Sequence, residues 1–154
     1  EDAFKFAKMG GTIDLTCGES ESKFHSVADA VKKAKEEGVP MEKVTMSSDG
    51  QGSWSNYDAE GKLVEIGVSD VDTIYRQIVY MAKEENMDFE ELLALGTKNT
   101  AMALELYPKK GAVKEESDAD ILIMNEDLSL DTVIAMGVPM MRDGKILKKG
   151  TYEK

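Results

Sequence analysis

The chain has 154 residues, of which 42% are hydrophobic, and a formal net charge of −11 from 30 acidic and 19 basic residues. This is enough for one core of about the commonest domain size, and the acidic balance disfavours nucleic acid and anionic lipid as partners. No run of about 18 apolar residues and no charged-then-apolar leader is present, so we expect no membrane span, no secretory signal and a cytoplasmic location.

Two strand–helix units are predicted in the first 50 residues. Residues 3–9 have the pattern of the last turns of a helix, and residues 10–16 alternate as a strand does. Apolar residues recur at helical spacing over 22–37, before the stop signal of Gly38 and Pro40. A second strand follows over 44–48. The order helix, strand, helix, strand is typical of parallel βα units.

Three consecutive helices are predicted between residues 69 and 106. A turn or small hairpin around Glu60-Gly61 precedes them. Ser69, Asp88 and Thr97 each stand directly before a run with helical spacing, so each is expected to cap a helix N-terminus.

The pattern changes to short β-rich runs after Pro108. These runs cover residues 109–125, 131–141 and 143–150, and Asp143-Gly144 is the strongest hairpin signal among them. We therefore expect a domain boundary near Pro108, with residues 1–107 in an α/β domain and residues 108–154 in a β-rich one.

The predicted α/β elements are too few for a closed fold. A barrel needs eight βα units and about 250 residues, and parallel strands are normally flanked by neighbours. The first strand would be an edge without its partner. The sequence is therefore expected to be the C-terminal part of something larger.

The stretch "VTMSSDGQGS", residues 44–53, holds the candidate site. Asp49 follows the strand where α/β proteins commonly hold their functional residues. It is either a catalytic carboxylate or a residue that caps the turn. Ser53 can donate to an oxyanion from a glycine-rich loop in which Gly50 and Gly52 allow close backbone approach, or it is an ordinary turn serine.

Two further residues have weaker claims to a function. His25 lies off the apolar face of its predicted helix, so we interpret it as a solvated histidine rather than a metal ligand. Cys17 is the only cysteine, which excludes an internal disulfide and a cysteine-based zinc cluster. No base that would activate it lies nearby in sequence, so we expect an inert thiol.

Five segments, in order over nearly the whole chain, resemble the C-terminal portion of bacterial isoaspartyl (β-aspartyl) dipeptidases, which are members of the amidohydrolase superfamily. The resemblance implies the C-terminal part of a (β/α)8 TIM-like barrel, comprising its last two βα units and the following helices, together with C-terminal strands of a small β-sandwich. The segments are "FAKMGGTIDLT", "GVPMEKVTMSSDGQGS", "DAEGKLVEIGV", "SDADILIM" and "MRDGKILKKGTYE".

The resemblance also implies a chemistry for the candidate site. Asp49 matches the aspartate that ends barrel strand eight, contacts one metal of a two-zinc centre, hydrogen-bonds the bridging hydroxide and shuttles its proton to the departing amine. Ser53, with Gly50 and Gly52 beside it, matches a position that helps to hold the terminal carboxylate of the substrate. The other metal ligands and the substrate-binding arginines would lie upstream of Glu1, so this chain alone is expected to be inactive.

The expected partners follow from the resemblance. They are an isoaspartyl dipeptide as substrate, the missing N-terminal barrel portion and, in the intact enzyme, further copies in a homo-oligomer. The alternative is a noncatalytic remnant, or an interaction subunit that completes its barrel with a separate N-terminal chain. One residue departs from the pattern of the family. Glu116 stands where relatives often carry glycine, and this difference affects only the geometry expected for that turn.

Overall fold

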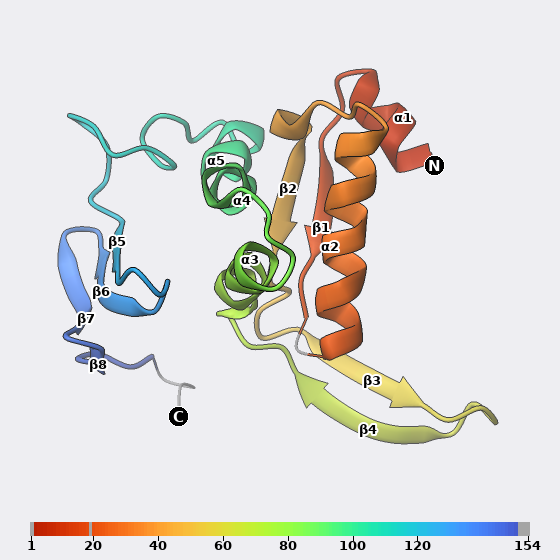
Figure 1. The fold of residues 1–154 in the computed structure, drawn as a ribbon. Helices are drawn as coiled ribbons and strands as arrows, with labels where there is room; N and C mark the ends of the chain where they lie inside the picture. The colour runs from red at the N-terminus through yellow and green to blue at the C-terminus, as the bar shows by residue number, and fades with distance from the viewer. Residues whose placement is uncertain (1, 19, 151–154) are drawn as a thin grey trace.

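The computed structural model describes residues 2–18 and 20–150 and contains three separate sheets (Figure 1). A parallel pair, β1-β2, is followed by an antiparallel ribbon, β3-β4, and by a four-stranded antiparallel sheet in the order β5-β6-β7-β8. Glu1 and residues 151–153 of the last segment with the resemblance lie outside the described residues.

The two predicted βα units are present with shorter strands. Helix α1 (Asp2–Lys8) precedes β1 (Ile13–Thr16), and helix α2 (Glu21–Glu36) connects it, through the short 3-10 helix η1 (Met41–Lys43), to β2 (Val44–Ser47). The strands are parallel, with Ile13 opposite Val44 and Thr16 opposite Ser47. Gly38, at φ +68°, ends α2 as predicted.

Helices cover one face of the parallel pair. Val44 and Met46 of β2 are almost fully buried there, with Val31 of α2 and Leu95 of α4 in the same cluster. The side chain of Asn99 in α5 donates to two backbone carbonyl groups, including that of Val44 at 2.9 Å. This contact fixes the start of β2, and therefore the direction in which the strand leads to Asp49.

The three predicted helices after the ribbon are present as α3 (Thr73–Lys83), α4 (Phe89–Gly96) and α5 (Lys98–Ala103). The predicted cap of α4 is confirmed, because the Asp88 carboxylate accepts from the Glu91 amide at 2.8 Å. None of the described helices has the length and apolarity needed to cross a membrane.

Of the other two predicted caps, that of Ser69 is wrong, and Thr97 holds the N-cap position of α5 without a side-chain capping bond. Helix α3 begins at Thr73, three residues later than expected, because both backbone groups of Ser69 bond to the loop that follows β2. Thr97 does stand directly before α5, but its hydroxyl donates to the Leu93 carbonyl of the preceding helix and caps nothing.

The predicted small hairpin is a ribbon of two strands, β3 (Ser53–Tyr57) and β4 (Leu63–Val68), joined by a turn with Gly61 at φ +79°. It begins where β2 ends. In Figure 1 its tip stands clear of every helix.

The third sheet contains β5 (Ile121–Met124), β6 (Leu130–Ala135), β7 (Val138–Arg142) and β8 (Lys145–Ile146). The hairpin at Asp143-Gly144 is confirmed, with both residues at positive φ. The interpretation of 131–141 as one run is wrong, because Met136-Gly137 forms a second turn with φ values of +49° and +77°. The Tyr75 hydroxyl of α3 donates to the Leu128 carbonyl between β5 and β6, at 2.9 Å.

Candidate active site

Asp49 lies two residues beyond the end of β2, with an exposed side chain and a left-handed backbone at φ +50°. Aspartate tolerates this conformation better than most residues. Within the part of the chain that the structure describes, its carboxylate makes no hydrogen bond. The backbone carbonyl of Asp49 accepts from the Gly52 amide at 2.8 Å, and the hydroxyl of Ser48 accepts from the Gly50 amide at 3.0 Å. The turn is therefore held by the backbone of Asp49 and the side chain of Ser48, and the Asp49 carboxylate caps nothing within the described residues.

The loop that carries Asp49 is fastened at both ends. The Gln51 amide donates to the Ser69 carbonyl at 2.8 Å, and the Ser69 amide donates to the Gly52 carbonyl at 2.9 Å. The hydroxyl of Thr73, at the start of α3, donates to the Ser48 carbonyl at 3.3 Å. Backbone bonds therefore position Asp49, while its carboxylate stays available for another contact.

Both glycines of the loop are needed for close packing. A Cβ on Gly52 would lie 2.7 Å from Oδ1 of Asp49 and 2.8 Å from its carbonyl oxygen, and a Cβ on Gly50 would lie 2.8 Å from Cγ1 of Val71. The left-handed positions of the loop are Asp49 and Gln51 rather than either glycine. The close backbone approach predicted for these glycines is therefore made to Val71 by Gly50 and to Asp49 by Gly52. The substrate-binding role of Gly50 and Gly52 stays a prediction.

Ser53 is the first residue of β3, where it pairs with Val68, and its side chain is exposed. Its expected place in the loop is wrong by one residue, because the ladder of the ribbon begins there. The hydroxyl follows the loop of Asp49 directly in sequence. Its role towards a substrate carboxylate stays a prediction.

The face of the parallel pair opposite the helices is polar. The carboxylate of Asp14 accepts from the hydroxyl of Thr45 at 2.8 Å and from that of Ser47 with its other oxygen. These contacts link β1 to β2 within two residues of Asp49. Asp14 was not singled out from the sequence. The signal was present, because Asp14 alternates with the half-buried Ile13 and Leu15 and must therefore lie on the opposite, polar face of β1.

Cys17 is buried, and burial, with a smaller contribution from Asp14, raises the pKa of its thiol to about 12. The thiol is therefore protonated at neutral pH, as expected for an inert cysteine. His25 is about half exposed and is not merely solvated: its Nδ1 lies 2.7 Å from the Tyr80 hydroxyl and 3.8 Å from the Glu85 carboxylate.

No group of three or more histidine, cysteine, aspartate or glutamate side chains close enough to hold a metal ion occurs within residues 2–18 and 20–150. Zinc in proteins takes three or four protein ligands. The residues present therefore do not fit a two-zinc centre by themselves. Asp49 can supply one carboxylate to a centre whose other ligands come from elsewhere.

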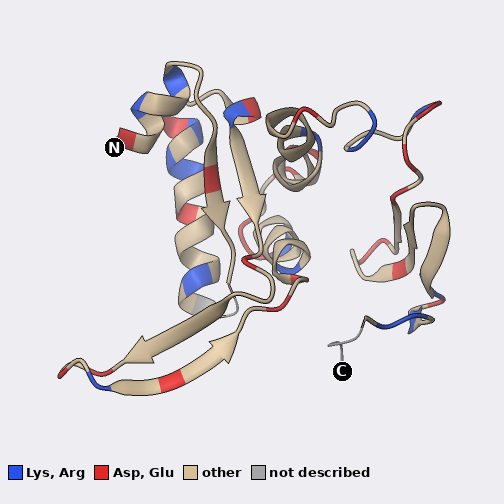
Figure 2. Cartoon of the chain, turned by 180° about the vertical axis from the view of Figure 1, so that it is seen from behind, with Lys and Arg blue, Asp and Glu red and all other residues tan. Residues whose placement is uncertain are grey.

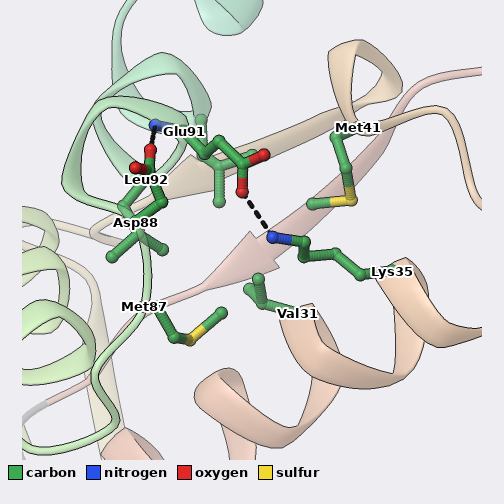
Figure 3. Close-up of a pocket in the computed structure, with 8 residues that line it drawn as sticks. Val31, Lys35, Met41, Met87, Asp88, Glu91 and Leu92 are labelled. Carbon is green, nitrogen blue, oxygen red and sulfur yellow. Dashed lines mark hydrogen bonds and ion pairs between the residues drawn. The ribbon is translucent and has the colours of Figure 1, made fainter.

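Two hollows lie away from Asp49. The first, between α2 and α4, has room for about one water molecule and is crossed by the ion pair of Lys35 and Glu91 (Figure 3). The second is an open hollow of about 310 Å³ between β1 and α2, bordered by Asp14 and Lys23. Neither is lined by a residue of the loop 48–53.

The sequence matches the amidohydrolase family over residues 4–147, so the chain belongs to that family. This family and its structural neighbours imply a TIM-barrel and β-sandwich architecture, of which the described residues form the small sheets given above.

The chain is similar to the β-aspartyl dipeptidase of the thermophilic, keratin-degrading Fervidobacterium islandicum AW-1, solved in complex with the dipeptide β-Asp-Leu. That similarity has a TM-score of 0.82 and 34% identity over 99% of this chain and 39% of the other. A second structure of a β-aspartyl dipeptidase from the same organism gives a TM-score of 0.72 and 30% identity, over 99% and 36%. The chain thus spans less than two fifths of these relatives.

A more distant structure is similar in fold alone. This is the N-acetylglucosamine-6-phosphate deacetylase of Pasteurella multocida, with a TM-score of 0.57 and 16% identity over 75% of this chain and 34% of the other.

Proposed function

We propose that this chain is the C-terminal portion of a zinc-dependent β-aspartyl dipeptidase, which hydrolyses isoaspartyl dipeptides. In this proposal, residues 1–107 are the C-terminal part of a (β/α)8 barrel, and β1 and β2 are the last two strands of that barrel. Residues 108–154 are the C-terminal segment of the β-sandwich domain of the same protein. The observation that carries the proposal is the place of Asp49, an exposed carboxylate at the carboxyl end of a parallel strand.

The family and the identity with two β-aspartyl dipeptidases support the substrate class. Two zinc ions, when bound in the complete enzyme, would supply a water molecule whose pKa is low enough to act as a nucleophile at neutral pH. The described residues do not fit such a centre alone, so the remaining ligands are assigned to the N-terminal barrel portion.

The role proposed for Asp49 is to accept a proton as the peptide bond is attacked and to return it to the departing amine. Its geometry suits this role in two respects. The turn bond between Ser48 and Gly50 leaves both carboxylate oxygens without a structural task, and the bonds of the loop to Ser69 hold the residue in place.

Ser53 is proposed to donate a hydrogen bond to the terminal carboxylate of the dipeptide. It follows Asp49 by four residues and stands at the start of an ordered strand. A hydroxyl in this position can distinguish a dipeptide, which ends in a carboxylate, from a longer chain that continues past that point.

The test compares two dipeptides that differ only in the aspartyl linkage. The natural protein, loaded with zinc, is expected to cleave β-Asp-Leu with a kcat/KM at least about tenfold above that for α-Asp-Leu, a difference of about 1.4 kcal/mol in transition-state binding. Residues 1–154 alone are expected to cleave neither dipeptide and to retain fewer than two zinc ions after dialysis.

Three results would overturn the proposal or part of it. No cleavage of β-Asp-Leu by the zinc-loaded natural protein contradicts the dipeptidase function. Two tightly bound zinc ions on residues 1–154 alone contradict the assignment of most ligands to another part of the protein. A natural chain of this length without activity would support the alternative of a noncatalytic subunit, and an intact mass measurement decides this point.

A further inference from the structure

The polar face of the parallel pair β1-β2 carries a carboxylate between two hydroxyl groups. One oxygen of Asp14 accepts from the hydroxyl of Thr45 at 2.8 Å, and the other accepts from that of Ser47. Asp14 is the only charged residue of β1 and β2, which are otherwise uncharged in Figure 2. Hydrogen bonds to an ionised group are shorter and stronger than neutral ones, so the carboxylate holds both hydroxyl groups of β2 in one geometry.

Under the proposed function, this polar face would be the interior of the barrel. The helices of a (β/α)8 barrel form its outer ring. Met46 of β2 packs beneath the helices, so its neighbours Thr45 and Ser47 point the other way. Barrel interiors are usually filled by bulky branched side chains. A carboxylate and two hydroxyl groups at such positions depart from that packing rule, and departures of this kind are expected at functional sites.

The two bonds of Asp14 meet β2 at different distances from the candidate site. Thr45 stands four residues before Asp49, and Ser47 stands two residues before it. Ser47 is also the last residue of β2, so its bond to Asp14 lies where the strand passes into the loop. On the other side of the loop, Ser69 and its neighbours hold the backbone. Asp49 therefore lies between two attachments, and Asp14 provides the one on the side of the strand.

The contacts of Asp14 indicate how it can affect the reaction. Both of its oxygens are engaged with β2 rather than with Asp49, so its effect on Asp49 passes through the strand. A general acid–base group must lie within hydrogen-bond reach of the proton that it transfers. A displacement of about 1 Å can lower the rate about 10²-fold. A small shift in the end of β2 is therefore enough to be measured in kcat.

We propose that Asp14 is a positioning residue that sets the geometry of Asp49 through the hydroxyl of Ser47. The proposal rests on the catalytic role proposed for Asp49. The bond from Ser47 to Asp14 fixes β2 against β1 where the loop begins, and this holds the Asp49 carboxylate at the reacting atoms. Because the bond serves the proton transfer and not the capture of substrate, kcat rather than KM depends on it.

The test measures kcat and KM for β-Asp-Leu, zinc content and urea unfolding on variants of the natural, zinc-loaded protein. Asp14→Asn keeps the shape, but its amide nitrogen cannot accept from a hydroxyl group. Ser47→Ala removes the partner nearer to Asp49, and Thr45→Val removes the more distant one. Asp29→Asn is the matched control, because it removes an exposed carboxylate from α2.

Asp14→Asn should lower kcat by about 10- to 100-fold and Ser47→Ala by at least about fivefold, with KM within about twofold of wild type and zinc retained. Thr45→Val should lower kcat less than Ser47→Ala but cost at least as much stability, because Thr45 is buried. The double variant of Asp14→Asn and Ser47→Ala should resemble Asp14→Asn alone, because the two residues act as a unit. The Asp29 variant should match wild type.

A kcat of the Asp14 variant within about twofold of wild type would overturn the proposal and leave the dipeptidase function standing. Losses of kcat that follow the losses of stability across the three single variants would also overturn it, since Asp14 would then only support the fold. Losses that accompany a loss of zinc would do the same, since Asp14 would then support the metal centre. If the wild-type protein does not cleave β-Asp-Leu, the proposed function fails and this inference fails with it.

Discussion

The two faces of the parallel pair β1-β2 differ in character, although their residues alternate along the same strands: one face is apolar and the other is polar. Val44 and Met46 point into the hydrophobic core beneath the helices, whereas Thr45 and Ser47 donate to the carboxylate of Asp14 on the other side. One face stabilises the pair by burial, and the other aligns the two strands through polar contacts. The strand that leads to Asp49 is thus fixed from both sides before the loop begins.

Cys17 gives the largest expected difference between the two faces. Its thiol lies on the core side with a pKa of about 12, against an ordinary value of 9.0, so at pH 8 the thiolate fraction is about 1,000-fold lower than in the unfolded chain. Alkylation by iodoacetamide, followed by peptide mass spectrometry, should therefore be at least about 100-fold slower than in concentrated urea. A folded-state rate within tenfold of the unfolded rate would place Cys17 outside the core.

Neighbouring substitutions in β2 compare the faces directly. Met46→Ala leaves a cavity and should lower the free energy of unfolding by about 2–5 kcal/mol. Thr45→Val keeps the shape but loses the contacts of the hydroxyl with the Asp14 carboxylate and the Ile13 carbonyl, and should cost about 1.5 kcal/mol, the low end for a bond to a charged group because Asp14 is exposed. Urea unfolding of the natural protein measures both. Equal losses would mean that the two faces do not differ as described.

Ser53→Ala tests the substrate contact at the end of the loop. A lost hydrogen bond to a carboxylate costs about 1.5–3 kcal/mol, and because the contact holds substrate and transition state alike, KM should rise more than kcat falls. Ser55→Ala, two residues further along the same face, is the control and should leave KM unchanged. An unchanged KM in the Ser53 variant would make Ser53 only the first residue of a strand.

Glu116→Gly should give the smallest effect, a gain in stability of about 1 kcal/mol. Glu116 has a φ of +69°, a conformation that costs a residue with a Cβ about 1–2 kcal/mol. Glycine removes that cost but has more freedom in the unfolded chain, which offsets part of the gain. Glu115→Gly is the control, because Glu115 does not have positive φ, and it should not stabilise. A melting temperature of the Glu116 variant at or below wild type would contradict this account of the turn.

The elements of the fold could be predicted where the local signal was strong. The apolar spacing of α2, the Asp88 cap and the turn at Asp143-Gly144 are short-range features, and all three are confirmed. The Ser69 cap failed for a long-range reason, since its backbone bonds to a loop about 18 residues earlier. The turn at Met136-Gly137 was missed because apolar residues on both sides hide its single glycine.

In the candidate site, too, local features could be predicted from the sequence and long-range contacts could not. The place of Asp49 after a strand could be predicted, because strand ends and glycines are visible in sequence. The contact of Asp14 with Thr45 could not, because it joins residues 31 positions apart. Nor could the packing of Gly52 against the Asp49 carboxylate, which depends on two left-handed residues that carry side chains, Asp49 and Gln51.

The most direct test of the central claim is the kcat of Asp49→Asn in the natural protein, measured with zinc content and a thermal melt on the same preparation. The amide keeps the size of the side chain but cannot accept a proton at neutral pH, so kcat should fall by about 10²–10⁴. Stability should change by about 1 kcal/mol or less, because the bonds that hold the turn come from the backbone of Asp49 and the side chain of Ser48, and the substitution alters neither. A kcat within about threefold of wild type, with zinc retained, would mean that Asp49 only shapes its loop and that the proposed catalytic carboxylate is wrong.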